Sequence, residues 1–358
     1  MPSLPPPDSS PPIRVKLLGK YRPGDDGRGW IARFPNGIPQ WGRCRYIFDR
    51  NCRDYDWLVV YDDMPSVAGE RHTLWEEHLA CPRQNTLFLT TEPSTIKVYG
   101  TRFLNQFGWV LTSQEPWVIN HPGTIRHQPG FIWYYSHNRP RGDYSTIAAN
   151  VPLSKTGDIS AVCSTKQQRY TLHRKRYEFV MGLKQRVPEM ELFGKGIRYV
   201  EDKADALDPF KYHVAIENFY GPHHWTEKLS DPFLGACMPV YYGCPNAEDY
   251  FPAESFLRID LADVDAAAEI IRRAITDRLY EKNLPAILES RRLVLEKYAP
   301  VAQITRIIEE RNNPAAPRPL PGDVVRTRHL MRRKSLVNGI SYLAEKVYVS
   351  SRHACGRG

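Results

Sequence analysis

Short apolar runs rich in β-branched and aromatic residues recur along the chain, and they constrain its fold more than any other feature. Turn-forming or helical material separates these runs, which lie at residues 15–18, 57–61, 87–91, 109–112, 131–135, 159–163, 190–193, 212–217, 238–242 and 256–259. Continuous apolar strands with helical spacers are what a parallel sheet covered on both faces requires. The sequence therefore predicts an α/β protein.

Helical periodicity is strongest in the second half of the chain. In residues 262–278 the apolar side chains follow an i, i+3, i+4, i+7 pattern, which predicts an amphipathic helix packed on a sheet. Residues 171–186 and 284–298 show a weaker form of this pattern. The polar, Gly-, Pro- and Asn-containing stretch at 136–158 suits a connection between two sheet domains, so we place the boundary near residue 155.

The two ends of the chain differ from its body. Residues 1–12 contain six prolines and lack a cationic start followed by an apolar run, so we expect a disordered leader and not a secretory signal. The body divides into sheet domains at 13–155 and 156–312. Residues 313–358 form a basic tail that opens with a Pro-rich linker.

Positive charge is concentrated in this tail. Of the formal net charge of +9, residues 313–358 carry +7, which leaves +2 for the rest of the chain. The near-neutral body argues against a basic nucleic-acid-binding protein, which stays an alternative. Leu336, Ile340, Leu343 and Val347 share one helical face after a basic cluster at 332–334. Either an amphipathic helix on an anionic membrane or a solvated or partner-packed tail fits this pattern.

Neither a membrane span nor a disulfide framework is expected. No window approaches the roughly 18 consecutive apolar residues that a spanning helix needs. The seven cysteines are scattered without a C-x-x-C motif, which is typical of reduced thiols in a cytosolic protein. His223 and His224 could suggest a metal, but no third ligand is suitably spaced, so we expect no metal site.

Polar residues gather where a predicted strand ends and a helix begins. The strand at 212–217 ends at Glu217 and Asn218, and after a polar loop a helix opens at Thr226, Glu227 and Lys228. In open α/β sheets ligands bind at this edge, and a helix N-terminus offers N–H donors to an anion. The alternative is an N-cap, a favourable first-turn acid and a surface charge.

Two further residues could carry chemistry. Arg174 opens the helix after the strand at 159–163 and could clamp a diphosphate, although its basic run also fits a solvated face. Glu92 follows the strand at 87–91 and could accept a proton from a hydroxyl. Asp62 and Asp63 flank another strand, where capping or solvation is the favoured interpretation.

These elements, taken in order, resemble a known family. The first set of motifs consists of Glu217 with Asn218, residues 226–228, a strand at 239–243 and a Phe-Pro-x-x-Ser-Phe segment at 251–256. A second set lies upstream and consists of residues 162–164, Arg174, a Gly-containing turn at 191–196, and residues 81–83 with 91–93. They resemble the family 10 glycosyltransferases, the α-1,3/1,4-fucosyltransferases, in their bacterial form. The likeness is strong over about residues 159–278 and moderate over 81–135.

The resemblance implies a GT-B fold, in which two Rossmann-like domains face each other across a cleft. The acceptor-side domain would be 13–155 and the nucleotide-sugar-binding domain 156–312. Glu92 would be the general base. The donor-binding residues that the resemblance implies are Arg174, Glu217, Asn218, His224, Glu227 and Lys228. The family usually has Tyr where this chain has His224.

The implied activity is the inverting transfer of L-fucose from GDP-fucose to a hydroxyl of a glycan acceptor, such as a GlcNAc-, Glc- or Gal-containing surface polysaccharide or lipopolysaccharide. No cofactor or metal is required, although a divalent metal could stimulate transfer. We expect a cytoplasmic enzyme, peripheral on the inner membrane through its tail. The alternatives are a glycosyltransferase of the same fold that uses another nucleotide sugar, and a catalytically silent sugar-binding relative.

Overall fold

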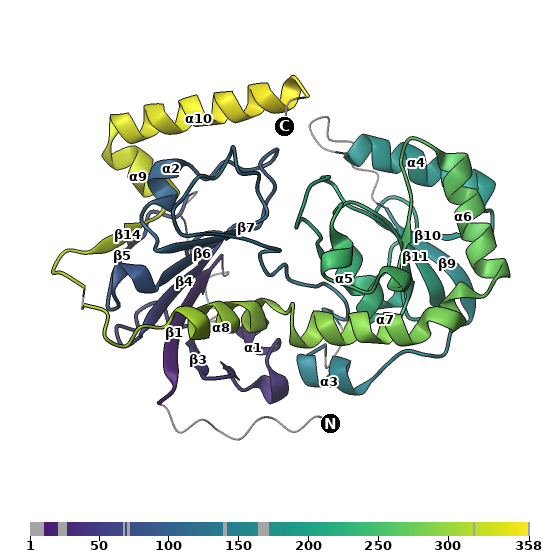
Figure 1. Cartoon of the computed structure of the whole chain (residues 1–358), viewed down its shortest axis with the longest axis horizontal. Helices are drawn as coiled ribbons and strands as arrows, with labels where there is room; N and C mark the ends of the chain where they lie inside the picture. Colours follow the sequence, from purple (N-terminus) through teal and green to yellow (C-terminus); the bar gives the residue numbers. More distant parts are fainter. Residues whose placement is uncertain are drawn as a thin grey trace.

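The computed structural model describes residues 11–20, 27–66, 69, 72–138, 142–163, 172–317 and 319–356. The leader expected at 1–12 lies almost entirely outside these residues. Two parallel-sheet domains lie side by side, the N-terminal one on the left of Figure 1 and the C-terminal one on the right. The predicted α/β class is confirmed, with two parallel-sheet domains as expected of a GT-B arrangement.

The N-terminal domain is built on a seven-stranded sheet in the order β2-β3-β1-β4-β6-β7-β8. All pairs in it are parallel except β2 with β3. The strands are β1 (Ile13–Gly19), β2 (Gln40–Trp41), β3 (Cys44–Ile47), β4 (Trp57–Tyr61), β6 (Thr86–Leu89), β7 (Trp109–Thr112) and β8 (Thr124–Arg126). The short β2, β3 and β8 escaped prediction because they lack continuous apolar runs. Three short helices accompany them, namely α1 (Arg28–Ile31), α2 (Thr101–Leu104) and α3 (Tyr144–Ala149).

The C-terminal domain holds a five-stranded sheet, parallel throughout, in the order β10-β9-β11-β12-β13. Its strands are β9 (Gly157–Val162), β10 (Glu191–Phe193), β11 (Phe210–Ile216), β12 (Met238–Tyr242) and β13 (Leu257–Arg258). Its helices are α4 (His173–Arg186), α5 (Glu227–Leu234), α6 (Val264–Thr276) and α7 (Leu279–Glu296). They pack in pairs, α4 with α6 and α5 with α7. All five strands and α4, α6 and α7 coincide with predicted elements.

Residues 131–135, predicted to be a strand, form an irregular crossing between the domains instead. Trp133 and Tyr135 are buried, but the backbone here bonds to side chains and not to a neighbouring strand. The Tyr134 N–H donates to the Asp231 carboxylate at 3.1 Å, and Arg33 Nη2 donates to the Trp133 carbonyl at 3.2 Å. A short buried aromatic run does not distinguish these two structures.

The C-terminal part of the chain returns to the N-terminal domain (Figure 1). Helix α8 (Pro300–Arg311) packs on β2 and β3, and Tyr46 Oη donates to the Val301 carbonyl at 3.0 Å. Strand β14 (Val324–Arg326) then pairs antiparallel with β5 (Glu76–His78), and Val325 is fully buried in the N-terminal core. The segment expected to be a tail is therefore part of this domain.

Helices α9 (Arg328–Lys334) and α10 (Leu336–Ala354) complete that segment, and α10 is the amphipathic helix that the sequence predicts. The α10 helix contacts α2 and crosses the top of the N-terminal domain in Figure 1. Within the described ranges, none of the helices combines the length and the apolarity that crossing a bilayer would take.

A buried ion pair links β1 to β5. Lys16, in the middle of β1, places Nζ 2.7 Å from Glu77 Oε1, and both side chains are fully buried. Lys16 also donates to the carbonyls of Arg50 and Cys52. Because β5 carries β14, this pair lies beneath the attachment of the C-terminal segment.

We expect Lys16→Met to lower the free energy of unfolding by about 3–5 kcal/mol, because Glu77 would stay buried without its main cation. Arg14→Met is the matched control on the same strand. The Arg14 side chain is 40% exposed, and its pairs with Asp54 and Asp56 are screened by solvent, so each should contribute less than about 1 kcal/mol. Denaturant unfolding of both variants measures the difference, and equal losses would contradict this assignment.

Candidate functional site

The end of β11 and the start of α5 form the centre of the candidate site. The N-cap of α5 is Thr226, whose Oγ1 accepts a hydrogen bond from the Lys228 N–H. Glu217, directly after β11, is fully buried and accepts the Thr226 N–H at 2.7 Å and its hydroxyl at 2.6 Å. Because each carboxylate oxygen is engaged in this way, Glu217 fixes the first turn of α5.

Glu227 and Lys228 form a close ion pair in that first turn. Lys228 Nζ lies 2.6 Å from Glu227 Oε1 and 3.9 Å from Glu217 Oε2. Burial opposes ionisation of Glu227, but the charges of Lys228 and Lys203 hold its pKa at about 2. Burial acts to lower the pKa of Lys228, but the carboxylates of Glu227 and Glu217 raise it above its ordinary value. The site therefore holds a fixed cation beside a carboxylate at neutral pH.

The basic run that opens α4 presents its two arginines to different surroundings. Arg176 is buried, and its Nη1 donates to Asn218 Oδ1 at 2.9 Å. Arg174 is exposed and bonds to Glu178 at 2.8 Å. Residues two apart on a helix point about 200° apart, so only one of them can face the sheet edge. Arg176, and not the predicted Arg174, lies with the other site residues.

Arg176 also has unused hydrogen-bonding capacity. Its Nε is buried and has no hydrogen-bond partner among the residues that the structure describes. A buried guanidinium N–H of this kind is costly to leave unpaired, and an anionic ligand would satisfy it. Its charge also acts on Lys228, which places the two cations near each other.

Glu92 reaches the site from the N-terminal domain. It is an exposed residue shortly after β6, and its backbone is held on both sides. The Thr91 N–H donates to Tyr99 Oη at 3.0 Å, and Gln114 Nε2 donates to the Glu92 carbonyl at 2.8 Å. Partial desolvation of its carboxyl, with the nearby charge of Asp62, raises the pKa of Glu92 above its ordinary value. A raised pKa makes a carboxylate a stronger base.

The two domains bring these groups within electrostatic reach of each other. The negative charge of Glu227, on α5, also raises the pKa of Glu92. Charges act in this way over distances of the order of a Debye length, about 10 Å. The Ser113–His224 hydrogen bond, 3.0 Å long, joins the end of β7 to the loop before α5. The carboxyl ends of strands from the two sheets therefore meet here, with the segment of Glu92 on one side and the loop that leads to Glu227 and Lys228 on the other.

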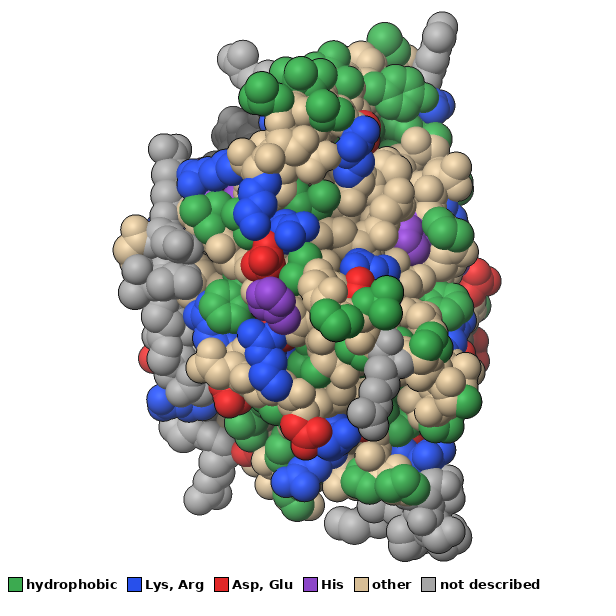
Figure 2. Space-filling view, turned by 90° about the vertical axis from the view of Figure 1, so that its left-hand side faces the viewer, with side chains coloured by type: hydrophobic (Ala, Val, Ile, Leu, Met, Phe, Trp, Pro, Cys, Tyr) green, Lys and Arg blue, Asp and Glu red, His purple; other side chains and the backbone are tan. Residues whose placement is uncertain are grey.

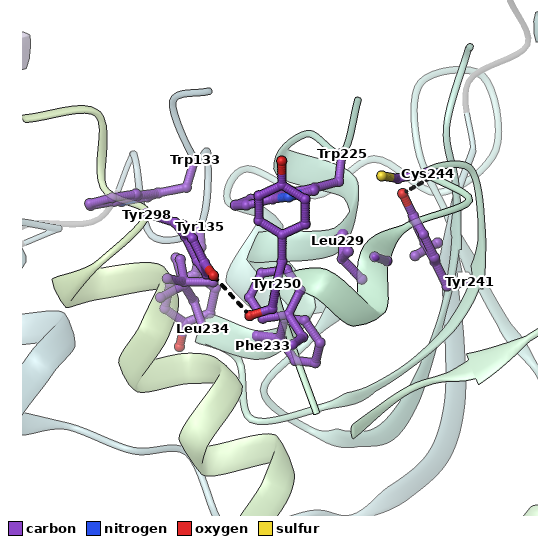
Figure 3. Close-up of a cluster of buried hydrophobic side chains, with 14 of the residues drawn as sticks. Trp133, Tyr135, Trp225, Leu229, Phe233, Leu234, Tyr241, Cys244, Tyr250 and Tyr298 are labelled. Atoms are coloured by element: carbon purple, nitrogen blue, oxygen red, sulfur yellow. Dashed lines mark hydrogen bonds between the residues drawn. The ribbon is translucent and has the colours of Figure 1, made fainter. Parts of the chain in front are cut away.

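The loop that joins β11 to α5 rests on buried aromatic side chains (Figure 3). The ring centroid of Trp225 lies 5.6 Å from that of Tyr250 and 5.0 Å from that of Phe251. His224, the residue before it, is buried and hydrogen-bonded to Ser113 of the N-terminal domain. The structure thus places this predicted donor-binding residue between the domains.

Asp62 was assigned wrongly from the sequence. It is neither a cap nor a solvated residue, because its buried carboxylate accepts hydrogen bonds from Lys97 Nζ and Tyr99 Oη, both at 2.6 Å. It directly follows β4 in the left-handed region, with φ of 66°. Its position after an apolar strand, at the same sheet edge as Glu92, is the signal that could have identified it.

Other parts of the described chain do not compete as sites. No group of three or more His, Cys, Asp or Glu side chains in the described ranges is arranged to hold a metal ion. A surface pocket of about 560 Å³ is lined by Gly157, Glu191 and Phe210 among others, at the amino ends of β9, β10 and β11. That edge is opposite to the one where the residues above meet.

Glu217 makes stability depend on pH in a defined direction. Burial raises its pKa from 4.5 to about 6, so the folded state binds this proton more tightly than the unfolded chain. The resulting stabilisation is present below pH 4.5 and is lost, by about 2 kcal/mol, as pH rises through 6. Glu217→Gln should remove this dependence while it keeps a hydrogen-bonding side chain at Thr226. Denaturant unfolding of both proteins at pH 4 and pH 7 tests this, and a pH-independent difference would contradict it.

Comparison with known proteins gives three findings. Residues 153–282 match the family described as glycosyltransferase family 10 (fucosyltransferase) C-term. An α-(1,3)-fucosyltransferase of Helicobacter pylori is 30% identical over 92 residues, which are 24% of this chain and 19% of the relative. The 4-galactosyl-N-acetylglucosaminide 3-α-L-fucosyltransferase 9 of Homo sapiens is 30% identical over 89 residues, 24% of each chain. The matched segments therefore span less than a quarter of these curated relatives.

Among solved structures, an α1,3-fucosyltransferase crystallised with GDP-fucose covers 83% of this chain and 94% of its own, with 15% identity and a TM-score of 0.45. The family match contains every candidate residue of the C-terminal domain, whereas Glu92 lies outside it. The domain at residues 153–282 is therefore similar to the C-terminal domain of glycosyltransferase family 10, the fucosyltransferase family.

Proposed function

We propose that this protein transfers L-fucose from GDP-fucose to a hydroxyl group of a glycan acceptor, with inversion at the anomeric carbon. The main support is the placement of a carboxylate with a raised pKa, Glu92, opposite the charged pair Glu227 and Lys228 on the other domain. The match of residues 153–282 to the fucosyltransferase family supports fucose as the sugar. A surface polysaccharide or lipopolysaccharide that contains GlcNAc, Glc or Gal is the acceptor class we propose.

On the donor side, Lys228 and Arg176 hold the diphosphate of GDP-fucose in this proposal. The β-phosphate gains negative charge as its bond to the anomeric carbon breaks, and preorganised donors contribute typically a few kcal/mol each. We assign to Arg176 the role that the family resemblance implies for Arg174, because Arg174 is exposed and paired with Glu178. Glu227 would bind hydroxyls of the fucose or ribose, and Asn218 the nucleotide sugar.

On the acceptor side, Glu92 takes the proton of the attacking hydroxyl. The hydroxyl oxygen bonds to the anomeric carbon from the face opposite GDP, the bond to the β-phosphate oxygen breaks, and GDP leaves. Because only the ionised form of Glu92 can act as a base, transfer should slow as pH falls through its raised pKa.

We propose that this reaction requires no metal ion. The charge that builds up on the leaving diphosphate is met by Lys228 and Arg176, which are held in place by Glu227 and Asn218. A divalent ion could stimulate transfer without being essential. We therefore expect transfer to continue in the presence of a chelator.

The exposed face of α10 supports a peripheral contact with an anionic membrane. Hydrophobic side chains gather at the top of the face shown in Figure 2, where α10 lies. The exposed ones on this helix are Leu336, Val337, Ile340, Leu343, Val347 and Tyr348. Arg333 and Lys346 are exposed nearby, and such basic residues favour anionic lipid. With all seven cysteines present as free thiols, we propose the cytoplasmic face of the inner membrane as the location.

Two variants test the chemistry. Glu92→Gln should lower kcat for transfer at least about 100-fold, because general-base catalysis contributes about 10² to 10⁴ in rate. Lys228→Ala should lower kcat and also weaken GDP binding. Transfer is measured as GDP release with an oligosaccharide panel, in the presence of EDTA. Near-normal transfer by both variants would remove the assignment.

The same proteins separate fucosyl transfer from the use of another nucleotide sugar. At a hundred times its dissociation constant GDP should stabilise the wild type and Glu92→Gln by about 2.7 kcal/mol, whereas UDP should not. Stabilisation by UDP and not by GDP would favour a different donor.

The membrane proposal predicts that the full chain sediments with vesicles containing anionic lipid and not with neutral ones. The double variant Ile340→Ser with Leu343→Ser should lose this binding, because it removes apolar area from the exposed face of α10. The matched control is Leu153→Ser with Ile197→Ser, which replaces exposed apolar residues on other elements. Equal vesicle binding by the two double variants would contradict a contact through α10.

A further inference from the structure

His224 is enclosed by parts of both domains. Its ring packs edge-on against Phe131 of the interdomain crossing at 5.2 Å and against Phe219 of its own loop at 5.1 Å. Its Nδ1 lies 3.0 Å from Ser113 Oγ, and both residues are buried. Burial lowers the pKa of His224 to about 3, so the ring is neutral throughout the neutral pH range.

The preceding residue ties the same loop to the C-terminal domain. His223 adopts a left-handed backbone conformation, with φ of 61°. Its Nδ1 lies 2.7 Å from Tyr250 Oη, and its N–H donates to Asn246 Oδ1 at 2.8 Å. Adjacent histidines are therefore bonded to opposite domains. The Gln128 N–H, from the crossing between the domains, donates to the same Tyr250 oxygen at 3.1 Å.

Ser113 is connected to the segment that carries Glu92. It directly follows β7, the neighbour of β6 in the sheet. The residues on either side of it bond to that segment: Thr90 Oγ1 donates to Thr112 Oγ1 at 2.9 Å, and Gln114 Nε2 donates to the Glu92 carbonyl at 2.8 Å. A shift of Ser113 would therefore move the backbone that supports Glu92.

His224 is equally close to the donor side. Only Trp225 separates it from Thr226, the N-cap that Glu217 holds and that precedes Glu227 and Lys228. The Ser113–His224 hydrogen bond thus joins the loop before the cationic pair to the strand end beside Glu92. Its length and burial make it a defined contact between the two halves of the site.

We propose that Ser113 and His224 are positioning residues that set the separation between Glu92 and Lys228 through their interdomain hydrogen bond. This inference rests on the proposed function, because it assumes that these two groups act on one donor and one acceptor. Neither residue takes part in the chemistry itself. Productive transfer depends on such alignment, since reacting atoms must be held within about 3–3.5 Å of each other.

The test uses Ser113→Ala, with Ser113→Thr as the variant that keeps the hydroxyl. The control is Ser160→Ala, because Ser160 on β9 also bonds a buried histidine, 2.8 Å from Oγ to His213 Nδ1, but within a single domain. Ser160 Oγ donates to the Ala206 carbonyl as well, at 2.6 Å. We expect Ser113→Ala to lower kcat about three- to tenfold, because the loss of one net hydrogen bond corresponds to a change of this size. The dissociation constant for GDP should stay unchanged. Ser113→Thr should keep kcat near the wild-type value. Ser160→Ala should lower Tm by a few degrees but leave kcat unchanged.

A second readout does not depend on activity. Backbone hydrogen exchange at residues 219–226 should become faster in Ser113→Ala and stay unchanged in Ser160→Ala. If exchange becomes faster in Ser113→Ala as predicted but the wild type transfers no fucose, the proposed function fails while the interdomain contact stands. Equal kcat in Ser113→Ala and Ser160→Ala, or unchanged exchange in Ser113→Ala, would overturn the positioning role.

Discussion

Burial of both faces of the two parallel sheets is the constraint on which the rest of this structure depends. Strands such as β4 and β12 are buried almost along their whole length and carry no charged side chain, so the polar groups beside them lie where the strands end. The polar residues at the candidate site fit this constraint, because Asp62, Glu92, Ser113 and Glu217 all lie within three residues of the carboxyl end of a strand. Apolar packing thus determines where chemistry can take place.

Much of the C-terminal domain could be predicted because its information is local. Apolar runs and helical periodicity are read within a window of a few residues, and they located β9 to β13 and α6. The orientation of the two arginines of α4 could not be predicted, because it depends on whether Arg176 or Arg174 meets Asn218 across the sheet edge. The return of residues 313–356 to the N-terminal domain was equally hidden, since it rests on pairings such as Val324 with His78, far apart in the sequence.

The charged groups of the candidate site largely balance one another before any ligand binds. Lys228 is paired with Glu227, and Lys203 Nζ lies 2.8 Å from Asp231. Burying such charges is tolerable only with partners at close range. An incoming anion must therefore compete with carboxylates already in place. The Nε of Arg176, which has no hydrogen-bond partner within the described ranges, offers a contact without that competition.

The position of Val325 has a consequence for how the molecule is made. This residue is fully buried in a core otherwise built from residues before 120, and its strand is synthesised after the whole C-terminal domain. The N-terminal domain would consequently be completed after the C-terminal one, because its own final strand follows residues 156–312 in the chain. Residues 156–312 could reach their native packing while the earlier half still waits with an uncovered edge at β5.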